Sequence, residues 1–139
     1  MTPYYFALLA AVLWGTATTM EKIALSQISP LMGLFIRSVA ITIFITMTLG
    51  FKKELNTLPH LPVKGVILFI ISGIVSAFLG QYFYFYAMQK APASKVVPVA
   101  GTYPLFAALF AIIFLGERLT ITNAIGIILI IAGLALVRS

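Results

Sequence analysis

Five apolar runs, each close to the length that an α-helix needs to cross a bilayer, follow one another along this chain of 139 residues. Charged residues or prolines separate the runs. Unpaired backbone groups are costly in lipid, so membrane spans are helices or closed barrels, and long runs without alternation indicate helices. We therefore predict an all-α integral membrane protein, a single domain over 1–139, with transmembrane helices at about 3–24, 31–51, 65–88, 95–115 and 121–137.

The composition agrees with this class and excludes several others. Hydrophobic residues make up 62% of the chain and charged residues 9%, and the mean hydropathy is +1.13. The net charge of +6 is scattered along the chain, whereas nucleic-acid binding needs clustered charge. The absence of cysteine excludes disulfides and thiolate chemistry, and the single histidine, His60 between two prolines, makes no metal site. We predict no cofactor, no bound metal and no nucleic-acid partner. The first span lacks a basic leader region and is expected to stay in the mature chain.

Basic residues are balanced between the two sides of the predicted bundle. An excess of Lys and Arg normally marks the cytoplasmic side. Such a tie is typical of a chain that inserts in both orientations, which would let two copies pair antiparallel; a small bias towards one side is the alternative. The N-terminal side carries Lys52, Lys53, Lys64 and Arg118, and the opposite side carries Lys22, Lys90, Lys95 and Arg138, with Arg37 inside the second span.

The first two spans form a predicted hairpin that places two opposite charges at the same depth. The turn centres on Ser29, and Glu21 and Arg37 each lie eight residues from it. Both are then roughly 10 Å inside the turn, where a lone charge costs about 2.5 kcal/mol or more. We expect the two side chains to form an ion pair.

A polar track is predicted to extend inward from this pair. Trp14 and Thr18 share a helical face with Glu21, although a cluster that snorkels to the headgroups is the alternative. In the third span, Gln81 needs a partner in another helix, in water or in a substrate. Tyr84 lies nearby among other tyrosines, which alternatively form an aromatic belt at the interface.

The fourth span is irregular, with Pro98, Gly101 and Pro104 within seven residues. Each proline removes a backbone hydrogen bond, so we predict a helix break that frees two carbonyl groups. Freed carbonyls at membrane depth are tolerated where they line a cavity, and Tyr103 adds polarity beside the break. A bend that serves packing alone is the alternative.

Small residues mark the end of the chain. Gly116 is suited to ending the fourth span, and Thr120 or Thr122 to capping the fifth. In the fifth span, Gly126 and Gly133 form a flat stripe that predicts a dimer interface; packing on the chain's own fourth span is the alternative.

Four segments together resemble the EamA family of the drug/metabolite transporter superfamily. They are "LWGTATTMEKIAL", "SPLMGLFIR", "PASKVVPVAGTYPLFAALFAIIFLGERLT" and "AIGIILIIAGLALV", which cover nearly the whole chain. Family members usually carry ten helices as two inverted five-helix repeats with the substrate cavity between them. The resemblance implies that this chain holds one repeat and that an antiparallel homodimer completes it.

The residues and the resemblance together predict a membrane transporter of small metabolites, an exporter or a facilitator, in the cytoplasmic membrane of a prokaryote. The predicted substrate-lining residues are Trp14, Thr18, Gln81, Tyr84 and Tyr103. Glu21, paired with Arg37, is the candidate for proton coupling, since the other carboxylates, Glu54 and Glu117, lie in loops. The alternative is a non-transporting membrane subunit, or one half of a heterodimeric transporter. No arrangement of residues typical of an intramembrane enzyme is present.

Overall fold

A computed structural model describes residues 3–118 and 120–138, and these residues form helices and no strand. The predicted all-α class is confirmed. Two compact units make up the chain, Met1–Lys90 and Ala91–Ser139. The elements of the first unit are α1 (Pro3–Ala24), α2 (Pro30–Phe51), the 3-10 helix η1 (Glu54–His60), α3 (Val63–Ser72), the π-helical segment η2 (Gly73–Gly80) and α4 (Gln81–Lys90). The second unit contains α5 (Ala93–Ala100), α6 (Tyr103–Leu115) and α7 (Ile121–Arg138).

Three stretches of the described chain are long and apolar enough to cross a membrane: Pro30–Phe51, Val63–Lys90 and Ala93–Leu115. A shorter apolar helix covers Ile121–Leu134. The helix α1 has the same bounds as the first predicted span, but it carries two charges near its end. The chain is thus a multi-pass membrane protein, and membrane crossing by α1 and α7 remains a prediction, as does a single five-helix domain.

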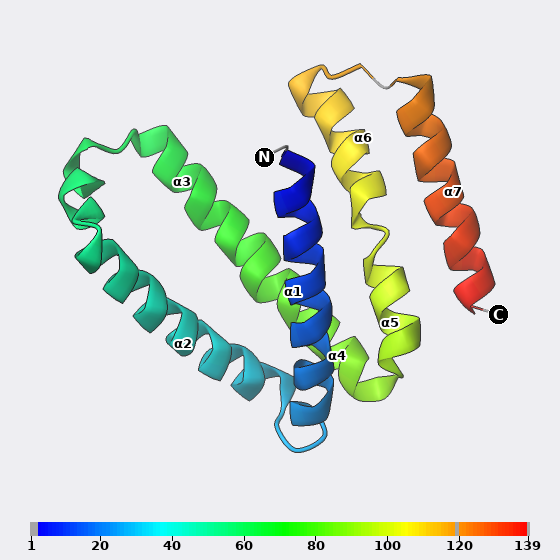
Figure 1. Cartoon of the computed structure of the whole chain (residues 1–139), viewed down its shortest axis with the longest axis horizontal. Helices are drawn as coiled ribbons and strands as arrows, with labels where there is room; N and C mark the ends of the chain where they lie inside the picture. The colour runs from blue at the N-terminus through cyan, green and yellow to red at the C-terminus, as the bar shows by residue number, and fades with distance from the viewer. Residues whose placement is uncertain (1–2, 119, 139) are drawn as a thin grey trace. The chain divides into compact units, whose positions relative to one another are not determined.

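Buried side chains of the first unit gather at one end of it. Within the described chain, the buried hydrophobic residues are Leu25, Leu34, Phe85 and Met88. They come from the turn after α1, the beginning of α2, and the middle and last turn of α4. Ser29 starts α2 there, because its side chain accepts a hydrogen bond from the Met32 amide (3.4 Å) and Pro30 follows it as the first helical residue. Figure 1 shows α2 and α3 running in opposite directions, with α4 returning to this end.

The third predicted span is one rod of three parts, because a π-helical segment separates α3 from α4. In a π-helix the backbone bonds run from i to i+5, and such segments often lie at functional sites. Gly73 and Gly80 bound the segment. We predicted no change of helix type here, because these glycines are equally typical of close helix packing.

In the second unit, the break in the fourth predicted span lies at Gly101 and Thr102, between α5 and α6. Pro98 lies inside α5 and Pro104 at the start of α6. The Thr102 side chain donates to the Val99 carbonyl (2.7 Å), which satisfies one acceptor at the end of α5.

The connection from α6 to α7 follows the predicted end signals. Gly116 has a φ of 66°, a left-handed conformation that glycine adopts without strain, and it ends α6. The Thr120 hydroxyl accepts a hydrogen bond from the Asn123 amide (3.2 Å) at the start of α7. Both predictions are confirmed.

Candidate functional site

The adjacent charges Glu21 and Lys22 near the end of α1 contact two different helices. Successive residues on an α-helix project about 100° apart. Glu21 Oε1 lies 3.4 Å from Arg37 Nη1 on α2, so the structure brings the predicted ion pair together. The Lys22 ammonium donates instead to the backbone carbonyl of Met88 on α4. The two charges therefore link α1 to both of its neighbours.

One turn before these charges, α1 contacts α4 through two hydroxyl groups. Thr18 Oγ1 lies 3.3 Å from the Tyr84 hydroxyl oxygen, a hydrogen bond in which either group can donate. Both residues are half-buried. Two of the predicted substrate-lining residues, from spans far apart in the sequence, thus meet in the structure.

The other threonines of the same segment make local hydrogen bonds. Thr16 donates to the Val12 carbonyl (3.0 Å) and Thr19 to the Gly15 carbonyl (3.4 Å), four residues earlier in their own helix. This is the usual way in which a helical threonine satisfies its hydroxyl group. Thr18 is different because its hydroxyl group bonds to another helix.

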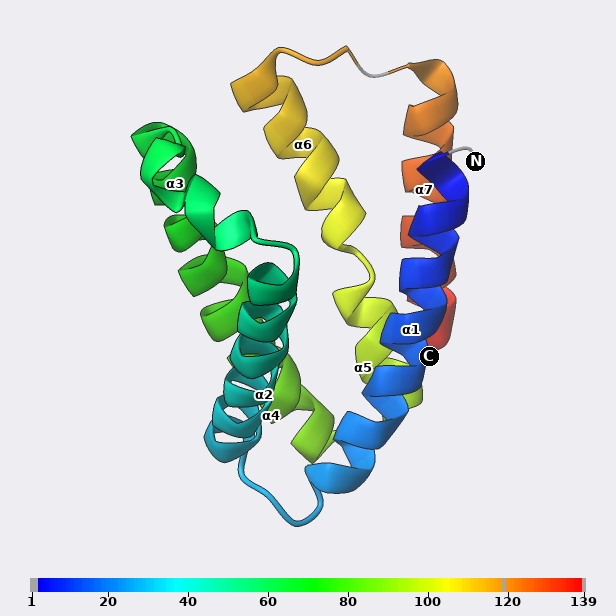
Figure 2. The same ribbon diagram turned by 60° about the vertical axis from the view of Figure 1, so that its left-hand side comes forward.

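The cross-helix contacts show that α1 and α4 run parallel. Thr18 pairs with Tyr84 and Lys22 with Met88, each 66 residues apart, so the register is constant over one turn. The ends of the two helices lie close together in both views of the ribbon (Figure 1 and Figure 2). Residues three or four apart share a helical face. Trp14 therefore lies one turn before Thr18 on the same face of α1, and Gln81 lies one turn before Tyr84 on the same face of α4.

The other predicted lining residues, Trp14, Gln81 and Tyr103, do not contact one another through hydrogen bonds in the described structure. Trp14 is 63% exposed, and Gln81 is half-buried at the start of α4, next to the π-helical segment. Neither side chain has a hydrogen-bond partner among the described residues. Tyr103 belongs to the second unit, where it is exposed at the start of α6. The structure therefore brings together Thr18 with Tyr84 and Glu21 with Arg37.

One further polar contact was not predicted from the sequence. Gln89, near the end of α4, donates through Nε2 to the Leu25 carbonyl just after α1 (3.2 Å). The sequence assigns no role to Gln89, and it places Lys22 only among the basic residues of one side of the predicted bundle. A proline four residues after Met88 is the one sequence signal that marks a carbonyl in need of a donor.

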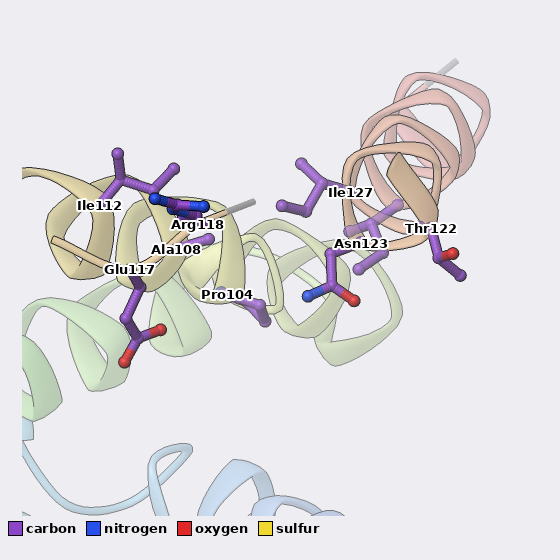
Figure 3. Close-up of a pocket in the computed structure, with 10 residues that line it drawn as sticks. Pro104, Ala108, Ile112, Glu117, Arg118, Thr122, Asn123 and Ile127 are labelled. Atoms are coloured by element: carbon purple, nitrogen blue, oxygen red, sulfur yellow. The ribbon is translucent and has the colours of Figure 1, made fainter. Parts of the chain in front are cut away.

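The second unit has its own open groove, between α6 and α7 beside the turn that joins them. Its volume is about 360 Å³. Figure 3 shows Asn123 and Ile127 of α7 pointing towards α6, with the side chains of Glu117 and Arg118 directed to different sides. Gly126, from the predicted dimer stripe, also lines the groove.

The chemical groups that the contacts between α1, α2 and α4 bring together are hydroxyls, a carboxamide, the Lys22 ammonium and one ion pair, while α1 also carries the Trp14 indole and α4 the Gln81 carboxamide. Among the described residues, no group of three or more His, Cys, Asp or Glu side chains lies together. Hydroxyl and amide groups both donate and accept hydrogen bonds, so they suit a polar solute of low charge.

Comparisons with known proteins show similarity to chains that are named as uncharacterized transporters. An uncharacterized protein of Methanocaldococcus jannaschii is 30% identical over 135 residues, which are 97% of this chain and 95% of that protein. An uncharacterized transporter of a Sinorhizobium species is 26% identical, with 93% of this chain and 91% of the relative covered. An uncharacterized transporter of Archaeoglobus fulgidus is 24% identical over 94% of this chain, which spans only 46% of that relative.

No solved structure matches the chain. The sequence profile of the EamA-like transporter family matches residues 1–139. The resemblance seen in the sequence is therefore confirmed, and the chain belongs to the EamA-like transporter family.

Proposed function

We propose that this protein transports small metabolites across the cytoplasmic membrane of a prokaryote as an antiparallel homodimer, with the substrate cavity between the two copies. The observation that carries the proposal is the hydrogen bond between Thr18 and Tyr84, which joins two apolar helices through polar groups. Beside it, the Glu21–Arg37 pair continues the polar surface to α2.

Unsatisfied polar groups on the same faces support a path for solutes. An amide or indole N–H within hydrocarbon must find a partner, because leaving it unpaired costs several kcal/mol. The side chains of Trp14 and Gln81 have no hydrogen-bond partner among the described residues. A substrate, water in a cavity or the second copy would supply those partners.

The comparisons and the loop charges support two copies. The Archaeoglobus transporter is about twice as long as the segment that this chain matches, whereas the Methanocaldococcus protein is matched over 95% of its length. Transporter sites tend to lie between inverted repeats. Two copies of this chain in opposite orientations would supply such a pair, in agreement with the balanced basic residues of the loops.

The lining groups favour uncharged, zwitterionic or amphiphilic solutes over polyanions. Thr18, Tyr84 and Gln81 offer neutral donors and acceptors, and Trp14 offers an aromatic face. Of the two cations at this site, Arg37 pairs with Glu21 and Lys22 donates to the Met88 carbonyl, so both are already engaged within the chain.

The proposal is tested by reconstituting the purified protein in liposomes and measuring uptake of radiolabelled solutes. The panel contains zwitterionic amino acids, uncharged sugars and, as a contrast, tricarboxylates. We expect saturable uptake of at least one solute from the first two classes. No uptake from any class would contradict the proposal and favour a non-transporting subunit. A protein isolated only in complex with a different chain would contradict the homodimer.

Matched variants then test the site. For the transported solute, we expect Thr18→Val and Tyr84→Phe each to raise KM by roughly 2- to 10-fold, the range that one lost hydrogen bond gives. Thr19→Val and Tyr86→Phe are the controls, because Thr19 bonds within its own helix and Tyr86 is half exposed. Equal effects in test and control variants would exclude the Thr18–Tyr84 contact from the path.

Proton-driven accumulation by the wild type distinguishes a coupled transporter from a facilitator, and Glu21→Gln then tests whether Glu21 is the coupling group. Uptake down a solute gradient does not need a titrating group, whereas accumulation driven by an imposed proton gradient does. Accumulation that survives in Glu21→Gln would remove Glu21 as the coupling group. Glu54→Gln is the control, because Glu54 lies in η1, outside the long helices.

A further inference from the structure

The C-terminal ends of α1 and α4 are joined by two hydrogen bonds that run in opposite directions. Lys22 of α1 donates to the Met88 carbonyl in the last turn of α4. Gln89 of α4 donates to the Leu25 carbonyl, directly after α1 (3.2 Å). Because the two helices run parallel, each supplies a side-chain donor to the other's carbonyl end.

These carbonyls lack the donors that a continuing helix would provide. The last four carbonyl groups of any α-helix have no partner within the helix. For Met88, the residue four positions further on is Pro92, which has no N–H group. Met88 is 0% exposed, so water cannot replace the missing donor. The Lys22 ammonium also places a positive charge at the negative end of the α4 dipole.

We propose that Lys22 and Gln89 are positioning residues, which fix the register of α1 against α4 and thereby hold Thr18 opposite Tyr84. Lys22 lies four residues after Thr18, and Met88 four residues after Tyr84, so the two contacts are stacked one turn apart. A shift of α1 along α4 would break both. The inference rests on the proposed function, since the contact that it protects lines the proposed solute path.

Cross-linking tests the register directly, without any measurement of transport. The chain contains no cysteine, so Thr18→Cys and Tyr84→Cys can be combined without background labelling. The rate of intramolecular cross-linking by a short bifunctional methanethiosulfonate is then compared with and without Lys22→Met. We expect Lys22→Met to slow cross-linking by roughly tenfold, the factor that corresponds to about 1.4 kcal/mol for one lost charged hydrogen bond.

Two further variants make the result specific. Lys22→Arg keeps a charged donor and is expected to restore the rate, and Lys90→Met, at the exposed end of α4, is expected to leave it unchanged. Gln89→Glu keeps the size of the side chain but removes the donor, and it should slow cross-linking even if Lys22→Met does not fold. Rates equal to the parent in both Lys22→Met and Gln89→Glu would overturn the proposal.

A transport readout completes the test in protein with the native residues at positions 18 and 84. We expect Lys22→Met to raise the KM of the solute that wild type carries, with a smaller change in the maximal rate, and Lys22→Arg to rescue the KM. A normal cross-linking pattern without uptake of any solute would contradict the proposed function alone. An altered KM with an unchanged cross-linking rate would contradict the positioning role alone.

Discussion

Glu21 and Lys22 show how two neighbouring charges can both be accommodated in an apolar helix. Their different directions from α1 give each its own partner, a guanidinium on α2 and a backbone carbonyl on α4. Glu21 is 19% exposed and Arg37 40% exposed, so the pair is intermediate between a surface ion pair and a buried one. Its contribution to the free energy of unfolding should also lie between those of surface and buried pairs, because the cost of desolvation and the attraction between the charges both increase with burial.

Removing one partner tests this estimate. Arg37→Gln leaves the Glu21 carboxylate without its cation, and we expect the free energy of unfolding to fall by about 1–3 kcal/mol. The double variant Glu21→Gln, Arg37→Gln should recover part of the loss, because no lone charge remains. Thermal unfolding in detergent measures each variant, with Glu54→Gln as the control. A double variant less stable than Arg37→Gln would show that the lone Glu21 carboxylate is not the cause of the destabilisation.

Some of these residue contacts could be predicted from the sequence and others could not. Glu21 and Arg37 are equidistant from Ser29, so their meeting follows from the geometry of a hairpin. The bonds from Lys22 and Gln89 join residues more than 60 positions apart. They depend on which helix packs beside α1, and no local pattern contains that information.

At the scale of elements, α7 carries two glycines with open space around them, of which Gly126 lines the groove beside α6. A Cβ atom placed on Gly126 or on Gly133 meets no atom within 4 Å. Packing inside the unit therefore does not require glycine at either position, which supports the proposal that a second copy contacts this stripe. Small residues let helix backbones approach closely in membranes.

Substitution of the stripe separates assembly from folding. We expect Gly126→Leu and Gly133→Leu each to weaken dimerisation by roughly tenfold or more, because overpacking at a close helix contact costs about 1–3 kcal/mol. Thermal unfolding of the protomer should change little. Gly50→Leu is the matched control, since a Cβ there also meets nothing within 4 Å. Sedimentation in detergent measures the fraction of dimer. An unchanged dimer fraction in both α7 variants would exclude the glycine stripe from the dimer interface.

Element ends and helix types differed in how far the sequence could predict them. The apolar runs, Gly116 and Thr120 predicted helical segments and a turn, because each signal acts locally. The π-helical segment Gly73–Gly80 was not predicted, because its glycines fit ordinary packing equally well. The break at Gly101 and Thr102 was predicted only as a region, since two prolines flank it and either could have ended the helix.

At the scale of the whole molecule, the described chain has few buried side chains for its many apolar residues. Most large hydrophobic side chains are exposed, and the buried ones gather where α1, α2 and α4 meet. In a membrane protein this surface faces lipid or another protein chain, and lipid provides no hydrophobic force for helix association. Polar contacts and close packing must therefore define the assembly. This agrees with an assembly built from a polar track and a glycine stripe.

An antiparallel homodimer requires that the chain inserts into the membrane in both orientations. A cytoplasm-active fluorescent reporter and a periplasm-active phosphatase are fused in turn to the C-terminus in a bacterial host. Gln27→Lys, which adds a basic residue to the turn after α1, is the control and should raise the fluorescent signal, because the C-terminus is expected on the same side as that turn. We predict that both wild-type fusions are active at comparable levels. Activity of only one fusion would contradict the antiparallel homodimer.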